Sequence, residues 1–99
     1  MDKSRETTFG FICQSILMAY TDDQKKIFKH LMGYPISSVT VEDMKDYKKN
    51  GKLWEVHTNI RNGCVTLSED GSVDVTHYKK VDVEEEINKS IDKILGMIK

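Results

Sequence analysis

The sequence predicts an α+β domain: three N-terminal helices, then a three-stranded antiparallel β-meander, then a C-terminal helix, in one domain spanning 1–99. Three observations support this. The length fits one domain. Both ends of the chain carry apolar side chains at helical spacing. Residues 52–81 contain two glycine turns between alternating apolar and polar residues, which is typical of antiparallel strands.

The first predicted helix covers residues 4–20 and has a wide apolar arc. Phe11 and Met18 extend this arc beyond a single stripe, so we expect them either in the core or at the contact of a homodimer. The apolar positions that recur at the helical period are Phe9, Ile12, Cys13, Ile16, Leu17 and Tyr20.

Two capping pairs predict the next two helices. Thr21 and Gln24 match a capping box, so a second helix begins after Thr21, and it ends at Gly33, which can adopt a positive φ. Thr40 and Asp43 form a weaker pair. They predict a short third helix that stops at the next Asn-Gly dipeptide.

The meander is predicted from its two turns. Asn62-Gly63 favours a type I′ hairpin, which pairs Ile60 with Val65. The second turn is a three-residue loop with Gly71 in the left-handed region, so that Leu67 faces Val73. The resulting apolar face contains Trp54, Val56, Ile60, Val65, Leu67, Val73 and Val75.

The last predicted helix runs from residue 83 to the C-terminus, with Asp82 as its N-cap. We expect its apolar face to cover the sheet. That face consists of Ile87, Ile91, Ile94, Leu95 and Ile98.

Composition excludes several classes of protein. Fifteen basic and sixteen acidic residues give a net charge of -1, so no overall field attracts phosphate or an anionic membrane. The apolar stretch at 9–20 is too short to span a bilayer. Two cysteines without metal-ligand spacing predict a reducing, cytoplasmic setting. The richness in Lys, Asp, Ile and Asn suggests a low-GC genome, a phage or a mobile element.

Three side chains on adjacent predicted strands raise the question of a metal site. These are His57, Cys64 and His77. The predicted register places His77 on the face opposite to the other two, so we expect no metal and no cofactor. The sequence also contains no phosphate-binding loop, nucleophile elbow or zinc-protease helix motif, so we expect no enzymatic activity.

The polar face of the predicted sheet is the candidate partner-binding surface. Such a face is either simply solvated or used for recognition, and Arg61 and Tyr78 are residue types enriched among interface hot spots. The candidate binding residues are His57, Asn59, Arg61, Thr66, Asp74, Thr76, Tyr78, Lys79 and Lys80.

These patterns favour a small non-enzymatic protein that binds another protein as an inhibitor, adaptor or accessory subunit. The alternative is a nucleic-acid-binding regulator. From residue 41 onward, the order helix, three strands, helix is similar to double-stranded-RNA-binding domains. The helices followed by a hairpin resemble a winged helix with 40–49 as recognition helix. Acidic residues at 42, 43, 46 and 84–86 oppose phosphate contact, whereas lysines within 45–52 and at 79–80 would favour it.

Overall fold

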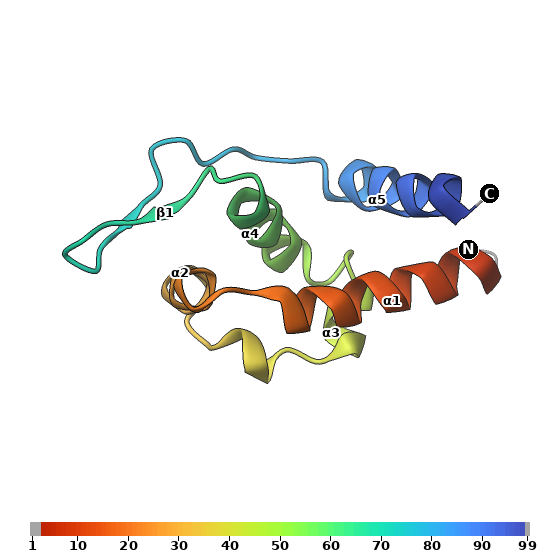
Figure 1. The fold of residues 1–99 in the computed structure, drawn as a ribbon, viewed down its shortest axis with the longest axis horizontal. Helices are drawn as coiled ribbons and strands as arrows, with labels where there is room; N and C mark the ends of the chain where they lie inside the picture. The colour runs from red at the N-terminus through yellow and green to blue at the C-terminus, as the bar shows by residue number, and fades with distance from the viewer. Residues whose placement is uncertain (1–2, 99) are drawn as a thin grey trace.

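A computed structural model describes residues 3–98 and the side chains of residues 5–97. Within this range the chain forms five α-helices, one 3-10 turn and one antiparallel hairpin (Figure 1). The elements are α1 (Lys3–Ala19), α2 (Asp22–Met32), η1 (Ile36–Ser38), α3 (Val41–Lys45), α4 (Gly51–Arg61), β1 (Thr66–Leu67), β2 (Val73–Asp74) and α5 (Val83–Ile98). The predicted α+β fold with a three-stranded meander is therefore wrong, because the described residues are mainly helical with a two-stranded sheet.

The first predicted strand is in fact helix α4. Buried Leu53, Val56 and Ile60 recur at i, i+3 and i+7, which is the period of a helix. Trp54, Val56 and Ile60 also satisfy the two-residue period of a strand, so the alternation that suggested a strand was ambiguous. The strand register left Leu53 on the polar face, whereas the helix buries it together with the other three.

The Asn62-Gly63 pair ends α4 instead of forming a hairpin turn. Asn62 has a negative φ of -85° and only Gly63 is left-handed, at 71°. The Gly63 amide donates to the Ile60 carbonyl at 3.2 Å, and the Cys64 amide donates to the Asn59 carbonyl at 2.9 Å. This pair of bonds is the Schellman arrangement, which satisfies carbonyls at a helix C-terminus.

The second predicted turn is confirmed. Leu67 lies opposite Val73, the Ser68 amide donates to the Ser72 carbonyl at 2.8 Å, and Gly71 has a φ of 86°. This left-handed backbone conformation is strained for most residues, but not for glycine, which has no side chain. The loop length fixed by Gly71 therefore sets the register of the only hairpin in the described chain.

Strand β2, which corresponds to the third strand of the predicted meander, is much shorter than predicted. The Asp74 carboxylate accepts from the Thr76 amide at 2.9 Å, and the Tyr78 amide donates to the Val75 carbonyl at 3.0 Å. These turns take the backbone away from the ladder after Asp74. Residues 75–82 consequently form an irregular connection to α5, which we call the strap.

The helix starts follow the predicted capping pairs. In both pairs, Thr21 with Gln24 and Thr40 with Asp43, the side chain and backbone of the two residues bond reciprocally at 2.9 and 3.1 Å. Gly33 ends α2 with a φ of 85°. The third helix, however, ends at 45, and the Asn-Gly pair predicted to stop it begins α4 instead.

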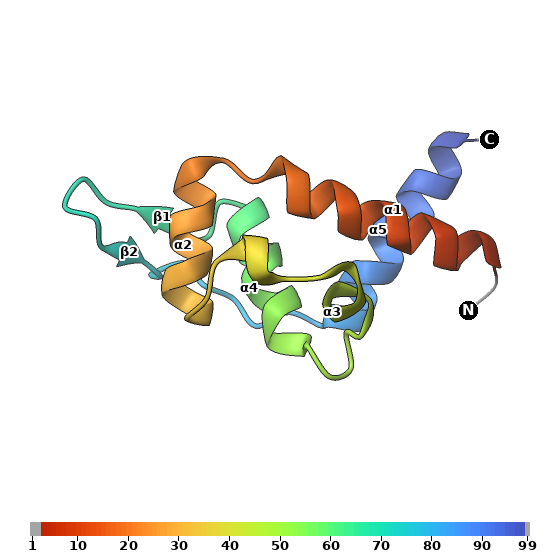
Figure 2. The same cartoon turned by 90° about the horizontal axis from the view of Figure 1, so that it is seen from below.

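The helices pack around α4, which lies between α2 and the pair α1 and α5 (Figures 1 and 2). The start of α1 and the end of α5 lie at one end of a molecule 45 Å long, with the hairpin at the other. The N-cap Asp82 is confirmed, since its carboxylate accepts from the Glu85 amide at 3.1 Å. The predicted packing of α5 on the sheet is wrong: Ile87 and Ile91 are buried where α5 meets α1 and α4, and the Ile98 side chain is outside the described residues.

No helix in the described range is both long and apolar enough to cross a membrane.

Candidate functional site

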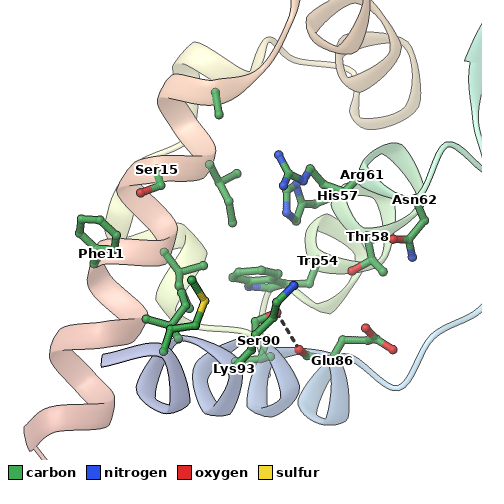
Figure 3. Close-up of a pocket in the computed structure, with 16 residues that line it drawn as sticks. Phe11, Ser15, Trp54, His57, Thr58, Arg61, Asn62, Glu86, Ser90 and Lys93 are labelled. Carbon is green, nitrogen blue, oxygen red and sulfur yellow. Dashed lines mark hydrogen bonds between the residues drawn. The ribbon is translucent and has the colours of Figure 1, made fainter. Parts of the chain in front are cut away.

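A groove of about 600 Å³ lies between α1, α4 and α5 (Figure 3). One wall is α1 and the other is α5, while α4 supplies the floor. The α1 wall consists of Phe11, Ile12, Ser15, Ile16 and Ala19. The floor consists of Trp54, His57, Thr58, Arg61 and Asn62. The α5 wall consists of Glu86, Ile87, Ser90, Lys93, Ile94 and Met97.

Trp54 is held rigidly at the floor of the groove. Its indole nitrogen donates to the Met44 carbonyl at 2.7 Å, and its ring stacks on Phe9 with centroids 5.7 Å apart. These contacts join α4 to α3 and α1. The indole nitrogen is thereby satisfied, and the residue is only 5% exposed, so Trp54 closes the floor of the groove as part of the buried core.

His57 lies beside Trp54 and is paired with Tyr20. The Tyr20 hydroxyl and His57 Nδ1 are 2.6 Å apart, and the two rings are stacked 5.7 Å apart. Burial, together with a smaller effect of the nearby Arg61 guanidinium, lowers the pKa of His57 to about 4. Burial also raises the pKa of Tyr20. A neutral His57 protonated at Nε2 fits the lowered pKa of His57 and the raised pKa of Tyr20, because its Nδ1 can then accept a hydrogen bond from the Tyr20 hydroxyl.

The exposed side of α1, which borders the groove at Phe11 and Ser15, carries large apolar side chains at helical spacing. Phe11, Ser15 and Met18 occupy i, i+4 and i+7 of α1, and Phe11 and Met18 are 65% and 79% exposed. Exposed apolar residues that share one helix face are typical of a docking stripe rather than of a solvated surface. The prediction that these two residues lie at a dimer contact is not tested by their exposure.

The α5 rim carries a matching line of residues. Glu86, Ser90, Lys93 and Met97 follow one another at spacings of four, three and four, and Met97 is 77% exposed. The Ser90 hydroxyl donates to the Glu86 carbonyl at 3.1 Å, drawn as the dashed line in Figure 3. Both rims therefore combine a small residue with a large exposed apolar one.

Arg5 joins the two walls near the open end of the molecule. Its guanidinium donates to the Asp92 carboxylate at 2.6 Å and to the Asn88 side-chain oxygen at 3.0 Å. Such a partly exposed ion pair adds little stability, but its two bonds fix the relative position of α1 and α5. Arg5 thus connects α1 to α5 beside the groove.

The residues predicted to bind a partner do not form one surface. His57 and Asn59 are buried in α4, and Arg61, at the C-terminal end of α4, lines the groove. Thr66 and Asp74 face each other on the exposed hairpin. The remaining candidates lie in the strap: Thr76, Tyr78, Lys79 and Lys80.

Asn59 ties the strap to α4. Its side-chain nitrogen donates to the carbonyls of Lys79 and Glu55 at 2.8 and 2.9 Å, and its oxygen accepts from the Lys79 amide at 2.8 Å. The Tyr78 hydroxyl adds a bond to the Glu55 carboxylate at 2.8 Å. The strap thus covers α4 at Glu55 and Asn59.

We expect Asn59→Ala to release the strap. Both backbone groups of Lys79, an exposed residue, would lose their partner, and a hydrogen bond of this kind contributes about 0.5–1.5 kcal/mol to the unfolding free energy. Hydrogen exchange should show faster exchange at the Lys79 amide. Tyr78→Phe is the matched control, because it removes only the bond to Glu55; equal acceleration in both variants would contradict the assignment.

The predicted cluster of His57, Cys64 and His77 is not brought together. His57 is buried in α4, Cys64 is half-buried just after it, and His77 is exposed in the strap. Among the residues that the structure describes, no group of three or more His, Cys, Asp or Glu side chains is placed to hold a metal ion. Burial raises the pKa of Cys13 to about 11, which keeps that thiol protonated.

Sequence reasoning missed the α5 wall and the role of Trp54. Met97 lies outside the isoleucine stripe of α5. An apolar residue at such a position was the signal in the sequence that α5 has a second apolar side. Trp54 was assigned to a strand, so its position opposite α1 and α5 could not be inferred.

The chain matches no protein-family model, no curated protein and no solved structure.

Proposed function

We propose that this protein is a small non-enzymatic domain that binds another protein through the groove between α1, α4 and α5, as a regulator, adaptor or accessory subunit. The observation that carries the proposal is the exposure of Phe11 and Met97, which line the two walls of the groove, with Met18 also exposed on α1. A monomer gains nothing from exposing such side chains together, whereas a partner would bury them.

The dimensions of the groove fit a helical segment. The α5 wall extends from Glu86 to Met97, about 17 Å along the helix axis at 1.5 Å per residue. Three turns of an amphipathic helix would fill that length, with apolar anchors at i, i+3 or i+4, and i+7. Trp54 would lie beneath such anchors, buried at the floor of the groove.

The chemistry of the site favours binding over catalysis. The His57 imidazole is committed to Tyr20 and is neutral, and the nearby hydroxyl and thiol groups have raised pKa values. A nucleophile needs a lowered pKa or an adjacent free base. Neither Tyr20 nor Cys13 meets this requirement.

The test is affinity capture from the host cell with the full chain and two groove variants. Phe11→Ser and Met97→Ser remove apolar anchors at the rims, and we expect at least about tenfold weaker capture of the specific partner, as for interface hot spots. Val75→Ser is the matched control, because Val75 is exposed in the strap away from the groove. Partners that bind all variants equally would contradict the proposal.

Trp54 supplies a direct second measurement. It is the only tryptophan of the chain and lies at the floor of the groove, so its emission reports on occupancy. A captured partner should shift the emission of the wild type but not that of Met97→Ser at the same partner concentration. An unchanged wild-type spectrum on binding would place the partner elsewhere.

Nucleic-acid binding is a second candidate, favoured by one observation. Two helices, α3 and α4, are joined by a turn and followed by the hairpin, which is the element order of a winged helix. Lys48, Lys49 and Lys52 lie in or after that turn. Against it, Asn59 on α4 is covered by the strap, and the hairpin tip is acidic.

A salt titration with duplex and single-stranded DNA separates the two candidates. We expect no binding that weakens linearly with the logarithm of salt concentration. Such binding, lost when Lys48, Lys49 and Lys52 are changed to glutamine, would replace the protein-binding proposal.

A further inference from the structure

The residues of α5 that line the groove carry charges that match a second, antiparallel copy of the same helix. Glu86 lies four residues before Ser90, and Lys93 lies three residues after it. When two identical helices pack antiparallel with their crossing point at Ser90, the order of residues in one is reversed relative to the other. The acidic position of each copy then meets the basic position of the other.

We propose that a second copy of this chain fills the groove, so that the two α5 helices pack antiparallel about Ser90 and each lies between α1 and α5 of the other copy. Glu86 of each copy then faces Lys93 of the other. This inference rests on the proposed function, since it names a first occupant for the same groove. Another protein would bind there in competition with the dimer.

Small residues on the walls leave room for the second helix. Ser15 and Ala19 lie on α1 and Ser90 on α5, all three lining the groove. Packed helices approach to about 8–10 Å between axes, and the closer distances require small side chains at the contact. Here a serine lies at the proposed crossing point itself.

The two-fold arrangement also explains the large exposed apolar residues. Phe11 of α1 and Met97 of α5 both line the groove, so a helix placed in the groove contacts both. Symmetry doubles this burial, because the same side chains of the second copy are covered by the first.

The opposite charges on α5 are not used up within one copy. Glu86 and Lys93 are seven residues, and thus about 10 Å, apart along one helix, beyond the i+3 and i+4 positions that pair directly. Glu86 has a long ion pair with Lys89 at 3.9 Å, which contributes little at the surface. Charge exchange between two copies therefore adds contacts that one copy lacks.

Sedimentation equilibrium of the purified full chain over a wide concentration range tests the inference. We expect a reversible dimer for the wild type. Glu86→Lys and Lys93→Glu should each weaken it roughly tenfold, since each variant sets like charges against each other at two symmetric positions. An equimolar mixture of the two variants should recover dimers, because a mixed pair has opposite charges at both positions.

Glu84→Lys is the matched control. It makes the same charge change in the same first turn of α5, but Glu84 does not line the groove. A monomeric wild type at every concentration, a dimer insensitive to both groove variants, or a mixture no stronger than the single variants would each overturn the inference. A monomeric wild type would leave the proposed function intact, because that function is tested separately by capture with Phe11→Ser against Val75→Ser.

Discussion

Phe28→Ala is expected to lower the unfolding free energy by about 3–5 kcal/mol, the range for removing a buried phenylalanine. The Phe28 side chain has no exposed surface. Its ring packs edge-on against Tyr20 and Tyr34, with centroids 6.0 and 5.8 Å away. Losing it would leave a cavity between α2 and the end of α1. Because a domain of this size is stable by about 5–15 kcal/mol, the variant would be close to unfolding.

Urea denaturation at a concentration where the protein is monomeric measures this change. Phe11→Ala is the matched control, because the same atoms are removed from an exposed position and the expected change is within about 0.5 kcal/mol. A similar loss in both variants would mean that Phe28 is not at the centre of the core. A small loss in Phe28→Ala alone would mean that the neighbouring rings collapse into the space.

Acidification is expected to destabilise the protein between about pH 6.5 and pH 4. Burial holds the pKa of His57 at about 4, below its usual value of 6.5. As the pH falls, the His57 side chain is therefore protonated in the unfolded chain before it is protonated in the folded one. The stability that neutral His57 contributes is complete above pH 6.5 and is lost towards pH 4. A difference of this size corresponds to about 3 kcal/mol of unfolding free energy.

His57→Gln should flatten the pH dependence of stability in this range, although it also loses some stability at neutral pH. His77→Gln is the matched control, because it makes the same substitution at a histidine that is exposed in the strap. Exposed Asp43, Asp70 and Asp74 have pKa values lowered by local hydrogen bonds. Their contribution is lost only below their usual pKa of about 3.8, so it lies outside the His57 window. A slope that persists in His57→Gln would refute the assignment.

The elements predicted correctly depend on contacts between residues close in sequence. Thr21 with Gln24, and Thr40 with Asp43, satisfy each other's backbone within one turn, whatever the rest of the chain does. Gly71 acts locally too, because its positive φ fixes the loop length. Such signals can be read from a short window of sequence.

The segment predicted wrongly is the one in which local signals support two structures. Trp54, Val56 and Ile60 fit a strand, while Leu53 with Val56 and Ile60 fits a helix. An Asn-Gly pair serves a hairpin turn and a helix end equally well. The choice is made by tertiary packing, since only the helix buries Trp54 against Phe9 while its nitrogen reaches α3.

The groove could be predicted only in part for the same reason. The excess apolar width of α1 was visible in Phe11 and Met18, and both are exposed. The opposite wall required knowing that α5 packs on α1 rather than on a sheet. Once the strand became α4, the predicted polar face no longer existed.

The position of the two helix ends has a practical consequence for any labelled form of this protein. The start of α1 and the end of α5 both lie at the end of the molecule opposite the hairpin (Figure 1), where the two helices diverge from each other (Figure 2). A fusion domain at either terminus would therefore stand close to the groove, whereas the exposed loop at 69–71 is far from it. Exposed loop tips tolerate insertion best. A fluorophore or epitope inserted in that loop should leave the groove accessible.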